Sequence, residues 1–210
     1  VRKETGKEFK NLPPKKKCKY TGGSHRVSPV DGGKSKFVLR CVPDCLAIVA
    51  LSLIVEQKAL VRAIGFGTLI EMKYDWLKKK LCEWLVDNVD TERSVLRVHG
   101  WELEPNATSF VQIIGISDGG IQVEVEGDMY EIAGYLDRFE AITFALFSLG
   151  SMLCPPGGVH ISSSLLFALN DLKRTSSRNW ASFCFGKLMQ GITRYIEEKL
   201  GYIGDCLLYL

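Results

Sequence analysis

The sequence has few of the residues that most often carry catalysis. It contains three histidines, His25, His99 and His160, in 210 residues. Cysteine-protease chemistry needs a thiolate, an imidazole beside it and a third group that orients the ring. No histidine lies in a recognisable catalytic pattern, because His25 belongs to a lysine-rich segment, His99 to a turn and His160 to the stretch after a Pro-Pro-Gly-Gly run. The sequence therefore predicts no catalytic residue.

Patterns for nucleotides and other cofactors are also lacking. Gly65-Phe66-Gly67 is too short for a dinucleotide-binding fingerprint, and no GxxxxGK[ST] phosphate-binding loop occurs. Pyridoxal phosphate would require a Schiff-base lysine, a phosphate-binding loop and an acidic partner for the ring nitrogen. No such set is recognisable, so we expect no cofactor.

Long hydrophobic runs are missing as well. The apolar stretch at residues 46–55 is ten residues long, too short to cross a bilayer, and no signal peptide is visible. The sequence thus predicts no membrane span. Because the chain starts at Val1 instead of methionine, the question whether a native N-terminus is missing stays open. We expect a nuclear or cytoplasmic location, and a mitochondrial one stays open.

Charge is strongly segregated along the chain. Residues 1–40 carry 12 Lys or Arg against three acidic residues, a net +9, whereas residues 41–210 carry 15 against 21, a net −6. This pattern predicts a basic disordered tail, residues 1–36, before a single mainly helical domain, residues 37–210. A short cluster in the tail resembles a nuclear-localisation or nucleic-acid patch, or else a solvated leader: Lys15, Lys16, Lys17 and Lys19.

The surroundings of the seven cysteines favour buried free thiols over a metal site. Cys82, Cys184 and Cys206 have apolar neighbours, which predicts buried free thiols in a reducing compartment. Cys41 and Cys45 have the spacing of half a zinc site. The remaining ligands would have to come from Cys18 and His25 in the tail, so we expect no metal.

The hydrophobic periodicity predicts a mainly α (α+β) fold with one or two small β-hairpins. A hairpin is expected across the His99-Gly100 turn, between residues 94–98 and 101–103, and a short strand at 121–125. Helices are expected at residues 45–64 (capped by Asp44), 74–89, 109–114 (capped by Asn106 or Thr108), 138–149, 162–172 and 179–200.

Two tryptophan-containing helices carry specific expectations. At residues 74–89 a stripe with 3–4 spacing should face the core: Trp76, Leu77, Leu81, Trp84, Leu85 and Val89. At the start of the last long helix, Asn179 should act as the cap and Trp180 should be buried in the first turn. Lys173, Arg174 and Arg178, just before that cap, are a second and smaller basic group.

Several dispersed segments together resemble a known family. They are residues 63–67, 81–90, 96–100, 110–116 and 119–120, followed by residues 170–172, 179–183 and 204–208. In this order they resemble the non-catalytic region upstream of the cysteine-protease domain in plant transposon-derived SUMO-protease-like proteins. The related plant mobile domain, often labelled "aminotransferase-like", has a similar style of pattern. The resemblance covers residues 46–210 and implies a region without catalysis of its own.

From the residues and the resemblance we expect a non-enzymatic protein–protein interaction module. It would be a stand-alone or truncated copy of the protease-associated domain, acting as an adapter or as an interfering, toxin/antidote-like factor. The alternative is a nucleic-acid-associated factor that binds weakly through the basic tail. An enzyme would require convergence around the hairpin of Asp87, Asp90, His99 and Asp118.

The C-terminal end of the sequence is an apolar run. Such a run must be buried or paired, so it predicts self-association, for instance as a homodimer. The residues concerned are Leu207, Leu208, Tyr209 and Leu210.

Overall fold

The computed structural model describes residues 37–73, 77–125, 139–155, 164–169 and 171–210. Within them the protein is mainly α-helical, with short strands in two small sheets, which confirms the predicted fold class. The helices are α1 (Pro43–Ser52), α2 (Val55–Ala63), α3 (Thr68–Glu71), α4 (Lys79–Asp87), α5 (Ala107–Ile114), α6 (Phe139–Ser148), α7 (Ser164–Leu169), α8 (Leu172–Thr175) and α9 (Trp180–Glu197), with a π-helical turn η3 (Leu149–Leu153) and a 3-10 turn η4 (Leu207–Tyr209).

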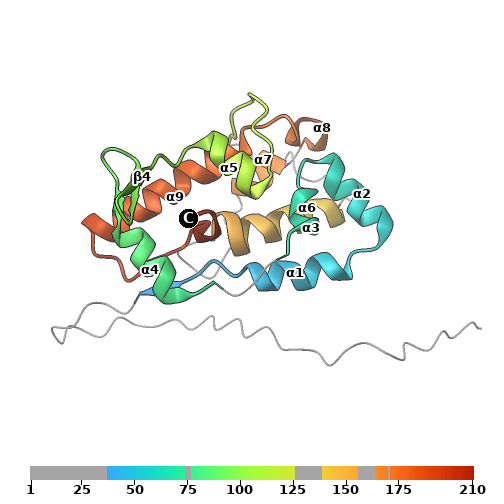
Figure 1. Ribbon diagram of the computed structural model, residues 1–210. Helices are drawn as coiled ribbons and strands as arrows, with labels where there is room; N and C mark the ends of the chain where they lie inside the picture. Colours follow the sequence, from blue (N-terminus) through green and yellow to red (C-terminus); the bar gives the residue numbers. More distant parts are fainter. Residues whose placement is uncertain (1–36, 74–76, 126–138, 156–163, 170) are drawn as a thin grey trace, which may run out of the picture.

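The helices surround a core that the C-terminal end of the chain enters. In Figure 1 the long helix α9 lies along one side of the molecule with α5 against it, α1 lies on the opposite side, and α6 runs between them. The C-terminus is at the centre of this arrangement, and η4 contacts α5. The buried cluster extends from Phe37 to Tyr209 and includes Phe66, Phe110 and Trp180.

The strands form two separate sheets. The first is a parallel pair of β1 (Val38–Leu39) and β5 (Tyr202–Ile203), which joins the start of the described residues to the segment after α9 and was not predicted. The second is antiparallel, in the order β2 (Val89–Asp90), β3 (Val95–Val98) and β4 (Trp101–Leu103). The hairpin β3–β4 confirms the prediction for residues 94–103.

The predicted continuous helix at residues 45–64 is wrong, because the chain is extended at Leu53 and Ile54. Local hydrogen bonds support this break. The Ser52 hydroxyl donates to the carbonyl of Val49 (2.7 Å), and the backbone N–H of Ile54 donates to the side-chain oxygen of Gln57 (2.9 Å). Both replace backbone partners that a continuous helix would use. Asp44 is not the cap, since α1 already begins at Pro43.

Helix α4 also differs from its prediction in length and in the face that it buries. It starts at Lys79, whereas residues 74–76 lie outside the described part. Of the predicted stripe, Val89 is buried and Leu77 and Leu85 pack against the core, as expected. Leu81 and Trp84 are exposed instead, and the fully buried positions of α4 are Cys82 and Val86. Both faces of this short helix are apolar, so the sequence pattern alone did not determine which one meets the core.

The later elements differ from their predicted bounds. Helix α5 begins after Asn106, whose side chain accepts a hydrogen bond from the N–H of Ser109 (2.9 Å), and it ends at Gly115 in the left-handed region, as expected. Residues 121–125 form no strand; Ile121 makes an isolated bridge to Arg178. The single helix predicted at 162–172 is two short helices, and α9 ends at Glu197.

The loop at residues 118–122 contacts residues 178–182 at the start of α9, and we call these contacts the clasp. Asp118 accepts hydrogen bonds from the N–H and the hydroxyl of Ser182 (3.0 and 2.7 Å), so this distant carboxylate caps the helix. The predicted cap, Asn179, instead accepts a hydrogen bond from the N–H of Gly120. Trp180 is fully buried, as predicted, and its indole N–H donates to the carbonyl of Thr175 (2.8 Å).

Among the described residues, no helix combines the length and the apolar character that crossing a membrane requires.

Candidate protein-interaction surface

The acidic residues considered for catalysis do not meet. Asp118 is engaged with Ser182 at the start of α9. Asp90 accepts from the guanidinium of Arg97 at 2.9 Å, within the three-stranded sheet. Asp87 is exposed at the end of α4, and His99 occupies the hairpin turn. Asp90 and Asp118 are thus engaged in separate structural contacts, and the four described side chains are not brought together as a catalytic site.

The half zinc site proposed for Cys41 and Cys45 does not hold thiolates for a metal. Cys41 is a buried free thiol that donates to the carbonyl of Met152 (3.4 Å), and Cys45 is disulfide-bonded. Over the described part of the chain, no three side chains of His, Cys, Asp or Glu are grouped so that they could hold a metal ion. The predicted free thiols Cys82, Cys184 and Cys206 are confirmed as free and buried.

The basic residues also differ in their surroundings. Lys15, Lys16, Lys17 and Lys19 lie outside the described residues. In the smaller group before α9, Arg178 is buried and donates to the carbonyl of Gln122 (3.0 Å), while Arg174 lies 3.5 Å from Asp171. Arg178 is therefore part of the clasp on α9 and is not available to a polyanion.

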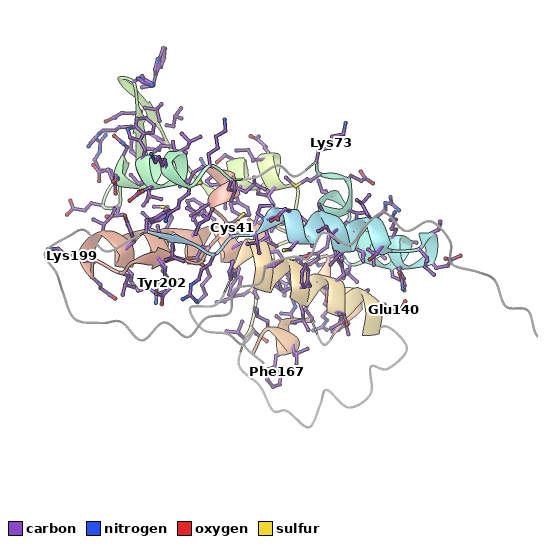
Figure 2. The ribbon with its side chains drawn as sticks, turned by 90° about the horizontal axis from the view of Figure 1, so that it is seen from below. Cys41, Lys73, Glu140, Phe167, Lys199 and Tyr202 are labelled. Atoms are coloured by element: carbon purple, nitrogen blue, oxygen red, sulfur yellow. The ribbon has the colours of Figure 1, made fainter. Side chains whose placement is uncertain are left out.

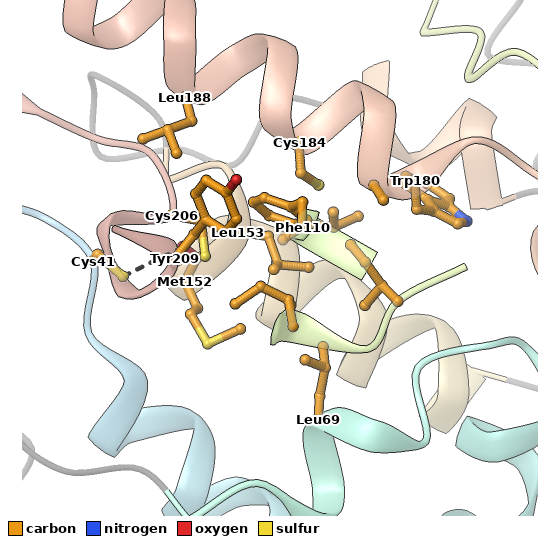
Figure 3. Packing of buried hydrophobic residues seen from close by; sticks show 14 of the residues in the cluster. Cys41, Leu69, Phe110, Met152, Leu153, Trp180, Cys184, Leu188, Cys206 and Tyr209 are labelled. Atoms are coloured by element: carbon orange, nitrogen blue, oxygen red, sulfur yellow. Dashed lines mark hydrogen bonds between the residues drawn. The ribbon is translucent and has the colours of Figure 1, made fainter. Parts of the chain in front are cut away.

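The apolar C-terminal run lies in the core of its own chain. Leu207 and Tyr209 are buried, and Leu208 and Leu210 pack against the same cluster. Figure 3 shows Tyr209 beside Phe110, with 4.9 Å between the ring centroids. The hydroxyl of Tyr209 accepts from the N–H of Asn106 (3.1 Å) and lies 2.5 Å from that of Ser109. This burial within the chain removes the reason for expecting self-association through these four residues.

The hairpin turn presents the most exposed tryptophan of the described residues. His99 and Gly100 form the two-residue loop and both have positive φ, 49° and 85°, as a type I′ turn requires. The turn places Trp101 at the start of β4, where 75% of its surface is exposed. A tryptophan exposed to this degree has an apolar surface that nothing in the described chain covers.

One face of the hairpin begins in the core and continues beyond it. Alternation along the strands puts the pairs Leu96–Leu103 and Val98–Trp101 on one face and the pair Arg97–Glu102 on the other. Leu96 is buried and Val98 is partly buried, whereas Leu103 and Trp101 are exposed. The apolar face of the hairpin thus extends from the core to solvent, past the region that the helices cover.

Helix α4 places a second tryptophan next to the exposed end of the hairpin. The ring of Trp84 lies 5.8 Å from the ring of His99, and 40% of Trp84 is exposed. Leu81, one turn earlier, is also exposed. We call this set the tryptophan surface: Leu81, Trp84, His99, Trp101 and Leu103. Figure 1 shows α4 and β4 side by side at one end of the molecule.

The opposite face of the sheet carries charged side chains, and its arginines pair with carboxylates of the same sheet. Arg93 and Arg97 both bond to Glu102 (3.2 and 3.1 Å), and Arg97 also bonds to Asp90. Hydrogen bonds from Arg97 and Arg93 lower the pKa of Glu102, and the N–H of Arg93, with help from Arg97, lowers that of Asp90. This ladder fixes the three strands beside the exposed apolar face.

A second exposed apolar group lies at the α1–α2 corner. It includes Leu51, 82% exposed, with Ile48, Ile54 and Val55. In Figure 1 this corner and the tryptophan surface are at opposite ends of the molecule. The corner has no aromatic side chain, so it provides a matched comparison for experiments on the tryptophans.

The tryptophan surface was not predicted, because the sequence pattern places Trp84 in the core and Trp101 only in a strand. One signal was present in the sequence. After the His99-Gly100 turn, Trp101 and Leu103 continue an apolar alternation that has no polar residue on the same face.

Comparison with known proteins gives a family and no activity. No curated protein and no solved structure matches the chain. A family model matches residues 39–141 and 128–210, which together cover most of the chain and nearly all of the described residues. The protein therefore belongs to the family described as a domain of unknown function (DUF8566).

Proposed function

We propose that this protein is a non-enzymatic protein-binding module that uses the tryptophan surface to contact a partner protein. The observation that carries the proposal is the exposure of Trp101 on a hairpin face that is otherwise continuous with the core. Tryptophan is enriched among the residues that supply most of the binding energy in interfaces. The adapter or interfering role that the family resemblance implies is part of this proposal.

The local structure favours a preformed contact. The turn and the charged ladder hold the hairpin, and the Trp84–His99 contact joins it to α4. A hairpin backbone held in this way loses little conformational freedom on binding, which raises the affinity obtained from a given contact area. Trp101 projects beyond the edge of the body and suits an apolar pocket in the partner.

The charges around the tryptophan surface indicate which charges the partner carries at the edge of its pocket. Lys78 and Lys80 are exposed at the start of α4, next to Leu81. The arginines on the other face are already paired with carboxylates. The complementary partner is therefore a folded protein with an apolar pocket and acidic residues at one edge of it.

The test compares capture by the full chain and by two variants under nuclease treatment. Trp101→Ala removes the projecting side chain, and Leu51→Ala is the matched control because it removes an equally exposed apolar side chain at the other end. The proposal expects a partner that the wild type and Leu51→Ala retain and that Trp101→Ala loses. With the purified partner, Trp101→Ala should weaken binding by at least about 2 kcal/mol, roughly 30-fold. Equal capture by all three proteins would contradict the proposal.

A second candidate function rests on the net +9 of residues 1–40. A basic segment of this kind binds nucleic acid through phosphates, without sequence preference and with strong salt dependence. Replacing Lys15, Lys16, Lys17 and Lys19 with glutamine in the full chain separates the two functions. Partner capture should survive this replacement if the tryptophan surface binds, whereas loss of all capture, or its removal by nuclease, would favour nucleic acid.

A further inference from the structure

Beyond the proposed function, we propose that Cys154 and Cys184 are an oxidation site, a dithiol that a hydroperoxide converts into an intramolecular disulfide. Their sulfur atoms lie 3.5 Å apart, with the Cys154 thiol donating to Cys184. Both are free cysteines. A modest rotation of the side chains would bring the sulfurs to bonding distance, about 2.05 Å.

Two independent elements hold the pair together. Cys154 is the capping residue directly after the π-helical turn η3, and its N–H donates to the carbonyl of Leu149 (2.7 Å). Cys184 lies on the buried face of α9. Single π-helical turns inside or after α-helices frequently occur at functional sites. Here the turn, which continues α6, delivers Cys154 to the side of α9.

The two sulfurs differ in access, which sets the order of the reaction. Cys184 is completely buried, whereas Cys154 is partly exposed. Burial, together with the contact to Cys154, raises the pKa of Cys184, so its thiol is a poor first nucleophile. A peroxide therefore reaches and reacts with Cys154 first.

The chemistry balances with one molecule of hydrogen peroxide, the simplest hydroperoxide, per pair. The Cys154 thiolate attacks one peroxide oxygen, so an S–O bond forms and the O–O bond breaks, giving a sulfenic acid and water after proton transfer. Cys184 then loses its proton and attacks the Cys154 sulfur. The S–S bond forms, the S–O bond breaks and a second water leaves. Two thiols are oxidised by two electrons and the peroxide is reduced.

A neighbouring pair of thiols lacks this access. Cys41 and Cys206 are hydrogen-bonded to each other, which together with burial raises the pKa of Cys206, and both are almost fully buried. Figure 3 shows Cys206 next to Tyr209, with Cys41 facing it from the segment before α1. This second pair is the internal comparison for the proposal, because it has proximity without a solvent-accessible member.

The experiment treats the full native chain with hydrogen peroxide, blocks remaining thiols and maps tryptic peptides by mass spectrometry. Cys154 falls in the peptide 139–173 and Cys184 in the peptide 179–187. We expect these two to appear linked, with a mass equal to their sum less two hydrogen atoms, and to separate on reduction. A link between the peptides 41–58 and 200–210 instead, or no link at all, would overturn the proposal.

Variants test the order of events. In Cys184→Ser the sulfenic acid on Cys154 cannot be resolved and should be trapped by dimedone, whereas in Cys154→Ser the Cys184 peptide should stay unmodified. Cys82→Ala, a buried thiol on α4, is the matched control and should keep the link. Thermal unfolding of each protein shows whether it is folded. Dimedone labelling of Cys184 in preference to Cys154 would contradict the order and the proposal with it.

Discussion

Asp205 lies in the segment between β5 and η4, and its replacement should change how stability depends on pH. Burial raises the pKa of this carboxyl to about 7, against an opposing effect of Arg194 and then Lys187. Asp205 sits directly on α9, where a Cβ added at Gly191 would collide with its carboxylate. The native state therefore holds a proton on Asp205 at pH values where the unfolded chain has lost it.

The sign of the effect follows from this difference. Between about pH 4 and pH 7 the native state binds more protons than the unfolded state, so rising pH lowers the free energy of unfolding. A shift of roughly three pKa units corresponds to about 4 kcal/mol. The destabilisation is absent below about pH 4 and is complete above about pH 7. Asp205→Asn, which carries no charge, should remove this dependence.

The assay is urea unfolding of wild type and Asp205→Asn at pH 5 and pH 8. The difference in the free energy of unfolding between Asp205→Asn and wild type should increase from pH 5 to pH 8 in favour of the variant. The increase should be up to about 3 kcal/mol, because most of the total of about 4 kcal/mol develops between these two pH values. Glu92→Gln, an exposed carboxylate in a turn, is the control and should show a small difference that is similar at both pH values. An Asp205→Asn difference that is the same at pH 5 and pH 8 would refute the reasoning.

Three further substitutions test contacts that position the core and the clasp, each by denaturant unfolding. Asp118→Ala removes the cap of α9 and should cost about 1 kcal/mol, whereas Asp118→Asn keeps an acceptor and should cost less; equal costs would contradict the capping role. Tyr209→Phe removes the hydroxyl contacts to Asn106 and Ser109 and should cost about 1 kcal/mol, while an unchanged stability would show that these contacts are dispensable. Gly115→Ala should cost at least about 1 kcal/mol, because φ is +76° and the new methyl group meets Thr68; Gly100→Ala, also at positive φ but with open space, should cost less.

The elements that the sequence predicted well are defined by local chemistry. The His99-Gly100 turn and the cap of α5 by Asn106 each involve residues within a few positions of one another. The burial of Trp180 was also predicted, because it lies in an apolar first turn. In each case the determining residues are neighbours in the chain, so their spacing is sufficient information.

The elements that the sequence predicted poorly depend on distant contacts or on a choice between similar faces. The carboxylate that caps α9 is Asp118, 64 residues away from Ser182. The pairing of β1 with β5 joins the two ends of the described chain. In α4, both the stripe with Trp84 and the stripe with Val86 are apolar, and only the tertiary structure selects the second for burial.

The tryptophan surface could not be predicted for the same reason, because the sequence does not show which of two apolar faces is buried. A prediction that buries Leu81 and Trp84 hides the part of the tryptophan surface that α4 supplies, and the exposure of Trp101 depends on where the hairpin extends past the helices. The apolar C-terminal run shows the reverse case, since Leu207 and Tyr209 are covered by their own chain. The sequence pattern alone does not show which apolar residues stay exposed.

Photo-crosslinking from position 101 tests the central claim most directly. A photoreactive phenylalanine analogue at this position keeps an aromatic side chain on the hairpin, and the same analogue at position 51 is the control. The account predicts a discrete protein adduct from position 101 that survives nuclease treatment and is absent from position 51. Adducts only from position 51, or only with nucleic acid, would contradict the assignment of the tryptophan surface as the binding site.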